Sequence, residues 1–154
     1  MRDSFLFVHS WMRWIVLLST LFLTIRFVMN WRKGIIWSGR DSFFSWAFEQ
    51  ALGYQILFGL TLLLANNPLV VTVVRNGMSA LSDPMLLFFT LIHPVAMILA
   101  MVIFQVGKNK TKSASIEKRQ RLMAFTFIAT TLLILAAIPW PIFSYGRALF
   151  RLGL

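Results

Sequence analysis

Four long apolar segments constrain the fold of this 154-residue chain more than any other feature. They cover about residues 5–29, 46–65, 85–107 and 122–143, and each is long enough to cross a hydrocarbon layer, which takes an α-helix of about 20 residues. Hydrophobic residues make up 58% of the chain, too many for a protein of this size to bury in its own core. We therefore predict an all-α integral membrane four-helix bundle, a single transmembrane domain over residues 1–154.

The basic residues predict the orientation of the chain. Loops 30–45 and 108–121 contain nine Lys and Arg residues, whereas the chain ends and the central connection contain four. Positively charged loops stay in the cytoplasm, so both termini are expected on the outer, periplasmic side of a bacterial inner membrane. The net charge of +10 then reflects topology rather than nucleic-acid binding. Connection 66–82 is too short to cross and is expected to be re-entrant or interfacial.

The chain contains no cysteine, which excludes iron–sulfur clusters, thiolate zinc sites and covalently attached c-type haem. The first segment is expected to be a retained span and not a cleaved signal peptide. His9 and Arg13 interrupt its apolar run, and no small-residue cleavage site follows.

Ionisable residues at membrane depth are rare and are candidates for function. Five such residues are expected here: His9, Arg13, Arg26, Glu49 and His93. Arg26 is near the inner end of its span and is predicted to extend its head group to the cytoplasmic surface. Glu49 is predicted to lie in the first turn of the second helix, where the helix dipole favours an acidic residue.

The two histidines are expected in the same leaflet. His9 lies about four residues into the first span and His93 about eight into the third, and both spans start on the outer side. Two imidazoles on facing helices of a bundle are typical ligands of a six-coordinate b-type haem. His9 and His93 are therefore the predicted metal ligands. Four further residues are predicted to contact the haem: Ala96 and Ala100 by leaving space, Met97 by packing on the ring, and Arg13 by binding a propionate.

Each of these residues also has a structural interpretation. His93 precedes Pro94, which frees the carbonyl of Thr90, and a local histidine hydrogen bond would repair that kink. Ala96 and Ala100 also form an ordinary helix-packing face of small residues. His9, beside a tryptophan, is equally typical of the membrane interface.

Four stretches, HSWMRW, GYQILFGL, HPVAMILAMVIFQVGKNKTK and IPWPIF, give the chain a resemblance to a known group of proteins. The group comprises small four-helix membrane proteins of Bacteroidota and related bacteria, uncharacterised or loosely labelled cytochrome b. The resemblance covers most of the chain and implies a b-type haem or a link to respiratory electron transfer. Members of the group often carry a third histidine just before the glutamine of the second span, where this chain has Tyr54. The matching residues are His9, Arg13, Gln55, His93, Pro94, Met97 and the turn Pro139–Trp140–Pro141.

These patterns favour a small b-type cytochrome-like membrane subunit that binds haem b between its first and third helices and transfers electrons within a respiratory or related complex. Its expected partners are other membrane subunits, lipid and quinol. No residue resembles a catalytic acid, base or nucleophile, so the chain is not expected to be an enzyme by itself. The alternative is a haem-free accessory subunit that packs within a larger complex and contacts lipid or pigment. A channel or transporter is less favoured, because no carboxylate is expected at mid-membrane depth.

Overall fold

The computed structural model describes residues 2–65 and 67–148, which form helices and no strands. The long helices are α1 (Arg2–Arg32), α2 (Gly39–Leu64), α5 (His93–Ser113) and α6 (Ile116–Ala137). Between α2 and α5 lie α3 (Pro68–Asn76), the 3-10 turn η1 (Gly77–Ser82), α4 (Pro84–Leu87) and the π-helical turn η2 (Phe88–Ile92). Four stretches are long and apolar enough to cross a membrane, namely α1, α2, the continuous run Pro84–Ser113, and α6. The prediction of an all-α chain with four candidate spans is confirmed for the described residues.

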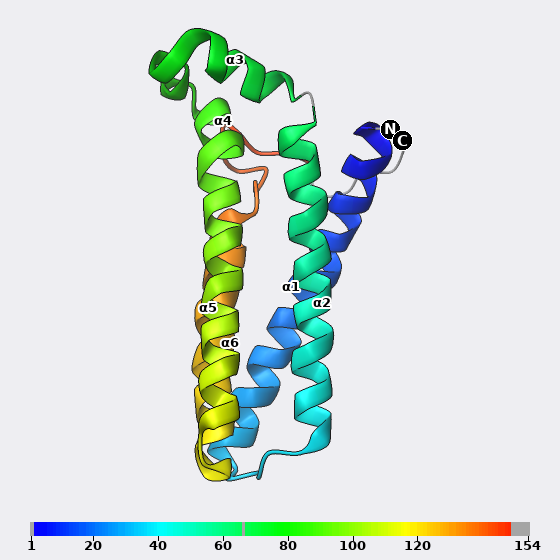
Figure 1. Ribbon diagram of the computed structural model, residues 1–154, viewed down its shortest axis with the longest axis vertical. Coiled ribbons are helices and arrows are strands. Elements are labelled where there is room, and N and C mark those ends of the chain that lie inside the picture. Colours follow the sequence, from blue (N-terminus) through cyan, green and yellow to red (C-terminus); the bar gives the residue numbers. More distant parts are fainter. Residues whose placement is uncertain (1, 66, 149–154) are drawn as a thin grey trace.

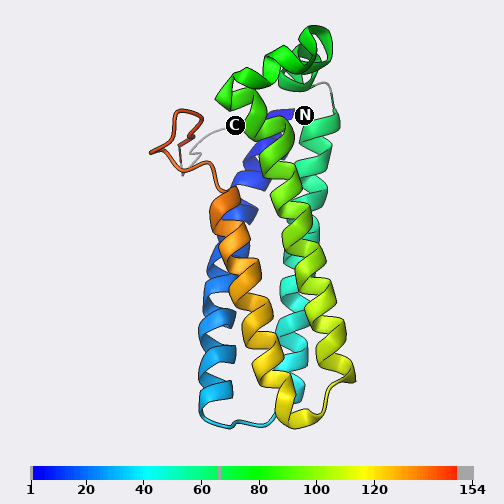
Figure 2. The ribbon, with the colours of Figure 1, turned by 90° about the vertical axis from the view of Figure 1, so that its left-hand side faces the viewer.

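The long helices run side by side, and α3 lies across one end of the bundle (Figures 1 and 2). We call this the α3 end; it also carries the start of α1 and the turn that follows α6. The opposite end, with the two short connections, is the loop end. The α3 segment is not inserted between the long helices, which favours the interfacial over the re-entrant interpretation. Val71 and Val74 of α3 and Met78 of η1 are exposed apolar residues.

The helices at the loop end are longer than the predicted spans. Only residues 33–38 separate α1 from α2, and only 114–115 separate α5 from α6. Much of the basic residue content expected in loops 30–45 and 108–121 therefore belongs to helix ends, where polar side chains can face the membrane surface. The fourth span was predicted to reach residue 143, but α6 ends at Ala137. The cause is Pro139, because the residue before a proline is forced into extended backbone, as Ile138 is with ψ of 130°.

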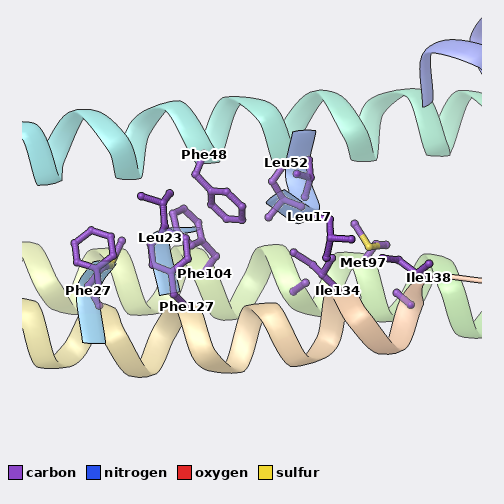
Figure 3. Close-up of a cluster of buried hydrophobic side chains, with 14 of the residues drawn as sticks. Leu17, Leu23, Phe27, Phe48, Leu52, Met97, Phe104, Phe127, Ile134 and Ile138 are labelled. Carbon is purple, nitrogen blue, oxygen red and sulfur yellow. The ribbon is translucent and has the colours of Figure 1, made fainter. Parts of the chain in front are cut away.

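The buried core of the bundle combines aliphatic side chains with the rings of Phe27, Phe48, Phe104 and Phe127 (Figure 3). Phe127 of α6 lies 5.2 Å from Phe27 of α1, 5.0 Å from Phe48 of α2 and 5.5 Å from Phe104 of α5, measured between ring centroids. One side chain thus joins all four long helices. Each such ring pair contributes about 0.5–1.5 kcal/mol beyond the area that it buries.

Small and polar residues bring the helices close together. The Thr131 hydroxyl of α6 lies 2.8 Å from the hydroxyls of both Thr20 and Thr24 of α1. Gly107 of α5 packs so tightly on Thr126 of α6 that a Cβ at position 107 would clash with it. Close contacts of this kind stabilise helix association where lipid tails are as apolar as the helix surfaces.

Asp41 ties three elements together at the loop end. Its carboxylate, in a residue only 1% exposed, accepts hydrogen bonds from Arg26 of α1 (2.8 Å) and from Gln120 of α6 (3.0 Å). It also accepts from the backbone N–H of Ser38, 2.9 Å away, which closes the capping box of α2. The Arg26 side chain is 28% exposed, and its guanidinium is held by Asp41 in the first turn of α2, a partner that the prediction for Arg26 did not include.

The position of Glu49 along α2 also differs from the prediction. Because α2 begins at Gly39, Glu49 lies in the third turn and not the first. Its carboxylate accepts hydrogen bonds from Gln105 and Lys108 of α5. Glu49 thus joins α2 to α5 through an ion pair, and the helix dipole has little to do with its placement.

The isosteric variant Asp41→Asn is expected to lower the free energy of unfolding by about 3 kcal/mol, because it leaves the charge of Arg26 without its partner. The measurement is equilibrium unfolding in mixed micelles. Glu117→Gln, at an exposed position on α6, is the matched control and should change stability little. Equal stability of the two variants would contradict the role of Asp41.

Candidate functional site

A cavity of about 320 Å³ lies at the α3 end, between the four long helices. Small-molecule sites are typically about 300–1,000 Å³, mostly apolar, with a few polar groups, and this cavity fits that description. Its lining is mainly aliphatic, with polar side chains from several elements. The apolar lining residues include Leu6, Val16, Ile56, Leu60, Leu63, Leu69, Phe89, Pro94, Met97, Ile98, Ile134, Ile138 and Pro139. The polar lining residues are Arg2, His9, Ser10, Arg13, Gln55, Asn67, His93 and Arg147.

The local backbone places His93 on the cavity wall. Pro94 has no N–H and its ring crowds the preceding turn, which disfavours a regular α-helix at this point. The wider π-helical turn η2 precedes it, closed by the N–H of His93 donating to the carbonyl of Phe88. Turns of this kind are frequent at functional sites.

The His93 ring is oriented by the end of another helix. Its Nδ1 lies 2.7 Å from the carbonyl oxygen of Ala137, in the last turn of α6. A carbonyl can only accept, so Nδ1 carries the proton, and in the neutral ring Nε2 keeps a lone pair. His93 Nε2 makes no hydrogen bond to any of the residues that the structure describes. Histidines that bind metals are held in this same way, by a carbonyl on the other ring nitrogen.

His9 is held from α2. Its Nε2 lies 3.3 Å from Nε2 of Gln55, a residue only 3% exposed. Within the described part of the chain, His9 Nδ1 and Gln55 Oε1 are buried and have no hydrogen-bond partner. A buried polar atom without a partner costs about 1–3 kcal/mol. A group that fills the cavity and engages the His9 ring would remove part of that cost.

Gly59 makes room for the His9 ring. A Cβ at position 59 would lie 3.0 Å from His9 Cε1, closer than ordinary van der Waals contact. Gly59 is one helical turn from Gln55, so both face α1 from the same side of α2. Together they hold His9, one by a hydrogen bond and the other by leaving space.

The structure brings the two predicted metal ligands together. The ring centroids of His9 and His93 are 6.2 Å apart and the rings are nearly perpendicular, at 81°. Two imidazoles that bind opposite sides of one metal ion have ring centres about 6 Å apart, because each metal–nitrogen bond is about 2 Å long and each ring centre lies about 1 Å beyond its nitrogen. Among the described residues, no cluster of three or more His, Cys, Asp or Glu could hold a metal ion. A two-imidazole site therefore fits a metal that brings its other ligands with it, as haem does.

The other predicted site residues divide into two groups. Arg13 and Met97 line the cavity with the histidines. Ala96 and Ala100 are absent from its lining; Ala100 is fully buried and Ala96 packs against the hydrophobic core. Their position supports the helix-packing interpretation and not contact with a ligand. Tyr54 is 54% exposed, also lies outside this cavity, and cannot take the place of a third ligand in it.

The interpretation of His93 as a local kink repair is also corrected. Its ring bonds to Ala137 on α6 and not to the carbonyl of Thr90 on its own helix. The kink at Pro94 is accommodated by the π-helical turn itself.

Gly59→Ala is expected to displace the His9 ring by a few tenths of an ångström and weaken its bond to Gln55. Gly53→Ala is the matched control on the same helix, because a Cβ there would meet only Met101 Cε at 3.8 Å. Alanine favours a helix by about 0.5–1 kcal/mol over glycine, so Gly53→Ala should stabilise the protein and Gly59→Ala should not. The measurements are thermal unfolding in detergent and the rate at which diethyl pyrocarbonate modifies His9. Identical behaviour of the two variants would contradict the fit of His9 against Gly59.

Comparisons with models of protein families, with curated proteins and with solved structures find no match for this chain. We therefore infer function from the geometry of the cavity and its histidines.

Proposed function

We propose that this chain is a small b-type cytochrome-like membrane subunit, in which His9 of α1 and His93 of α5 would hold haem b. The observation that carries the proposal is the opposition of the two rings, 6.2 Å apart at the wall of a largely apolar cavity. His93 has its proton fixed on Nδ1 by Ala137, which leaves Nε2 as the ligand atom. When bound, haem b would supply reversible uptake of one electron.

The residues around the histidines have separate tasks in this proposal. Ala137 fixes the tautomer and angle of the His93 ring. Gln55 orients the His9 ring, and its amide decides which ring nitrogen keeps the lone pair. Apolar side chains such as Phe89 and Met97 exclude water and present flat or adaptable surfaces to a macrocycle.

The position of the cavity bears on the role of the subunit. It lies toward the α3 end and so near one surface of the membrane that the four long helices are able to span. A single haem near one surface does not carry an electron across the bilayer alone. We therefore place the chain within a larger respiratory or related complex of a bacterial inner membrane, with both termini periplasmic. Other membrane subunits, lipid and quinol are the proposed partners, and the chain is not catalytic by itself.

The test is an absorption spectrum of the purified protein in detergent, supplied with haemin and recorded oxidised and reduced. We expect one haem b per chain with the sharp reduced bands of a six-coordinate, low-spin iron. His93→Leu and His9→Leu should each abolish those bands. Tyr54→Leu should leave them unchanged, because Tyr54 faces away from the cavity.

Two outcomes would contradict the proposal. Folded protein that takes up no haem would reject it and favour the haem-free accessory subunit. Bands that survive both histidine substitutions would reject His9 and His93 as the ligands. Circular dichroism of each variant separates loss of the haem from loss of the fold.

A further inference from the structure

A second hollow, of about 340 Å³, lies on the outer surface of the bundle where α2 passes α5. It shares no lining residue with the histidine cavity. Its volume is within the range of small-molecule sites, about 300–1,000 Å³. We call it the polar hollow, and its lining residues are Glu49, Gln50, Gly53, Tyr54, Leu57 and Met101.

The polar hollow lies near the middle of α2. At a rise of about 1.5 Å per residue, Glu49 and Tyr54 are about 15 Å and about 22 Å from the start of a helix that is about 39 Å long. In the membrane that α2 is able to span, these polar groups lie at the depth of the hydrocarbon, where a polar group without a partner is costly. They therefore need partners, either from the chain or from a molecule within the membrane.

The chain itself satisfies only the carboxylate of the polar hollow. Glu49 accepts hydrogen bonds from Gln105 and Lys108 of α5, and its ion pair with Lys108 leaves the hollow without net charge. The Gln50 amide and the Tyr54 hydroxyl make no hydrogen bond to the residues that the structure describes, and both side chains are exposed. Two uncharged polar groups thus face the lipid beside a neutralised carboxylate.

The spacing of these two groups suits a ring with an oxygen on each side. Gln50 and Tyr54 are one helical turn apart, which separates their Cβ atoms by about 5–6 Å, comparable to the separation of the two oxygens of a quinol ring. An amide and a phenol hydroxyl can each donate and accept, so they can bind the hydroxyls of a quinol or the carbonyls of its quinone. Gly53, beside them, has no side chain, and a Cβ there would meet only Met101 Cε, at 3.8 Å. A ring can therefore come close to the backbone of α2.

Apolar side chains continue from the polar hollow along the same side of α2. Leu57 and Leu64 follow Gln50 by seven and fourteen residues, which places them on its side of the helix, and both are exposed. An isoprenoid tail can lie along them. A neutral polar site above an apolar strip fits a lipid-soluble quinol better than a phospholipid, whose charged head group stays at the membrane surface.

We propose that the polar hollow binds the head group of a lipid-soluble quinol, with Gln50 and Tyr54 hydrogen bonded to its two oxygens. This inference gives a binding site to the quinol that the proposed function names as a partner, and it goes beyond that function because it needs no bound haem.

The polar hollow and the histidine cavity are built on the same two helices. On α2, Tyr54 of the hollow is next to Gln55, which holds His9. On α5, Met101 of the hollow is one turn from Met97 of the cavity. This arrangement places a quinol in the hollow close to a group bound by the histidines.

The experiment is photolabelling with a decyl-tailed azidobenzoquinone. The full chain in phosphatidylcholine nanodiscs is irradiated with this probe at increasing concentrations of decylbenzoquinone as competitor, and labelled peptides are located by mass spectrometry. We expect labelling at residues 49–57 and at Met101 that the competitor suppresses. Tyr54→Phe and Gln50→Leu should each weaken the competitor by about threefold to tenfold, the effect of losing one hydrogen bond.

Tyr145→Phe is the matched control, because Tyr145 is outside the hollow and stacks on Phe88 through its ring, with centroids 4.1 Å apart. It should leave the competition unchanged. Gln50→Leu gives a second measurement: it removes an unpaired polar group from the hydrocarbon, so it should raise the Tm of the quinone-free protein while it weakens binding. His93→Leu should leave labelling of the hollow unchanged, because the hollow contains no part of the histidine pair.

Three outcomes would overturn the inference. The first is labelling that spreads over the exposed sides of the long helices or that the competitor does not suppress. The second is labelling confined to the histidine cavity, which would place the quinone there. The third is unchanged competition in both variants together with a changed number of chains per nanodisc, which would make the hollow a surface for docking another helix. A haem-free absorption spectrum would reject the proposed function and leave this inference standing.

Discussion

A backbone carbonyl released within a membrane bundle needs a hydrogen-bond partner, because the hydrocarbon around it offers none. The last turn of α6 releases such carbonyls where Pro139 ends the helix. Side chains satisfy two of them: Trp140 Nε1 donates to Leu135 (2.9 Å), and His93 Nδ1 donates to Ala137 (2.7 Å). The second bond joins α5 to α6, completes the end of α6 and fixes the tautomer of a proposed ligand. The candidate site depends on this one interaction more than on any other.

Hydropathy predicted the number of long helices but misplaced several of their ends. The four apolar runs have to lie against lipid or inside a core, so four long helices could be predicted from physical chemistry alone. At the loop end, the helices extend into the basic sequence, because a helix can continue past the hydrocarbon once its side chains reach water. The partner of Arg26 could not be predicted, since Asp41 lies outside the apolar run and reaches Arg26 only through the tight connection 33–38.

Part of the candidate site could also be predicted from the sequence. Shared depth in one leaflet placed His9 and His93 together, and the structure has their rings in contact distance. Sequence reasoning missed the Ala137 carbonyl, because a backbone atom leaves no chemical signal in a sequence. It also missed Gly59, although the four-residue spacing of Gln55 and Gly59, which puts both on one face of α2, is a signal that could have found it. Arg147 escaped because its position depends on a turn held by Phe88 and Tyr145, far apart in the chain.

The π-helical turn η2 has a consequence for helical phase. A π turn holds one residue more than an α turn, so it rotates everything before it by about 100° around the helix axis relative to a regular helix. Phe88 can thereby stack on Tyr145 while His93, five residues on, turns toward α6. A one-residue deletion between them would restore a regular helix and separate these two contacts, even if every remaining side chain were unchanged. Between Phe88 and His93, the number of residues therefore decides whether both contacts can form.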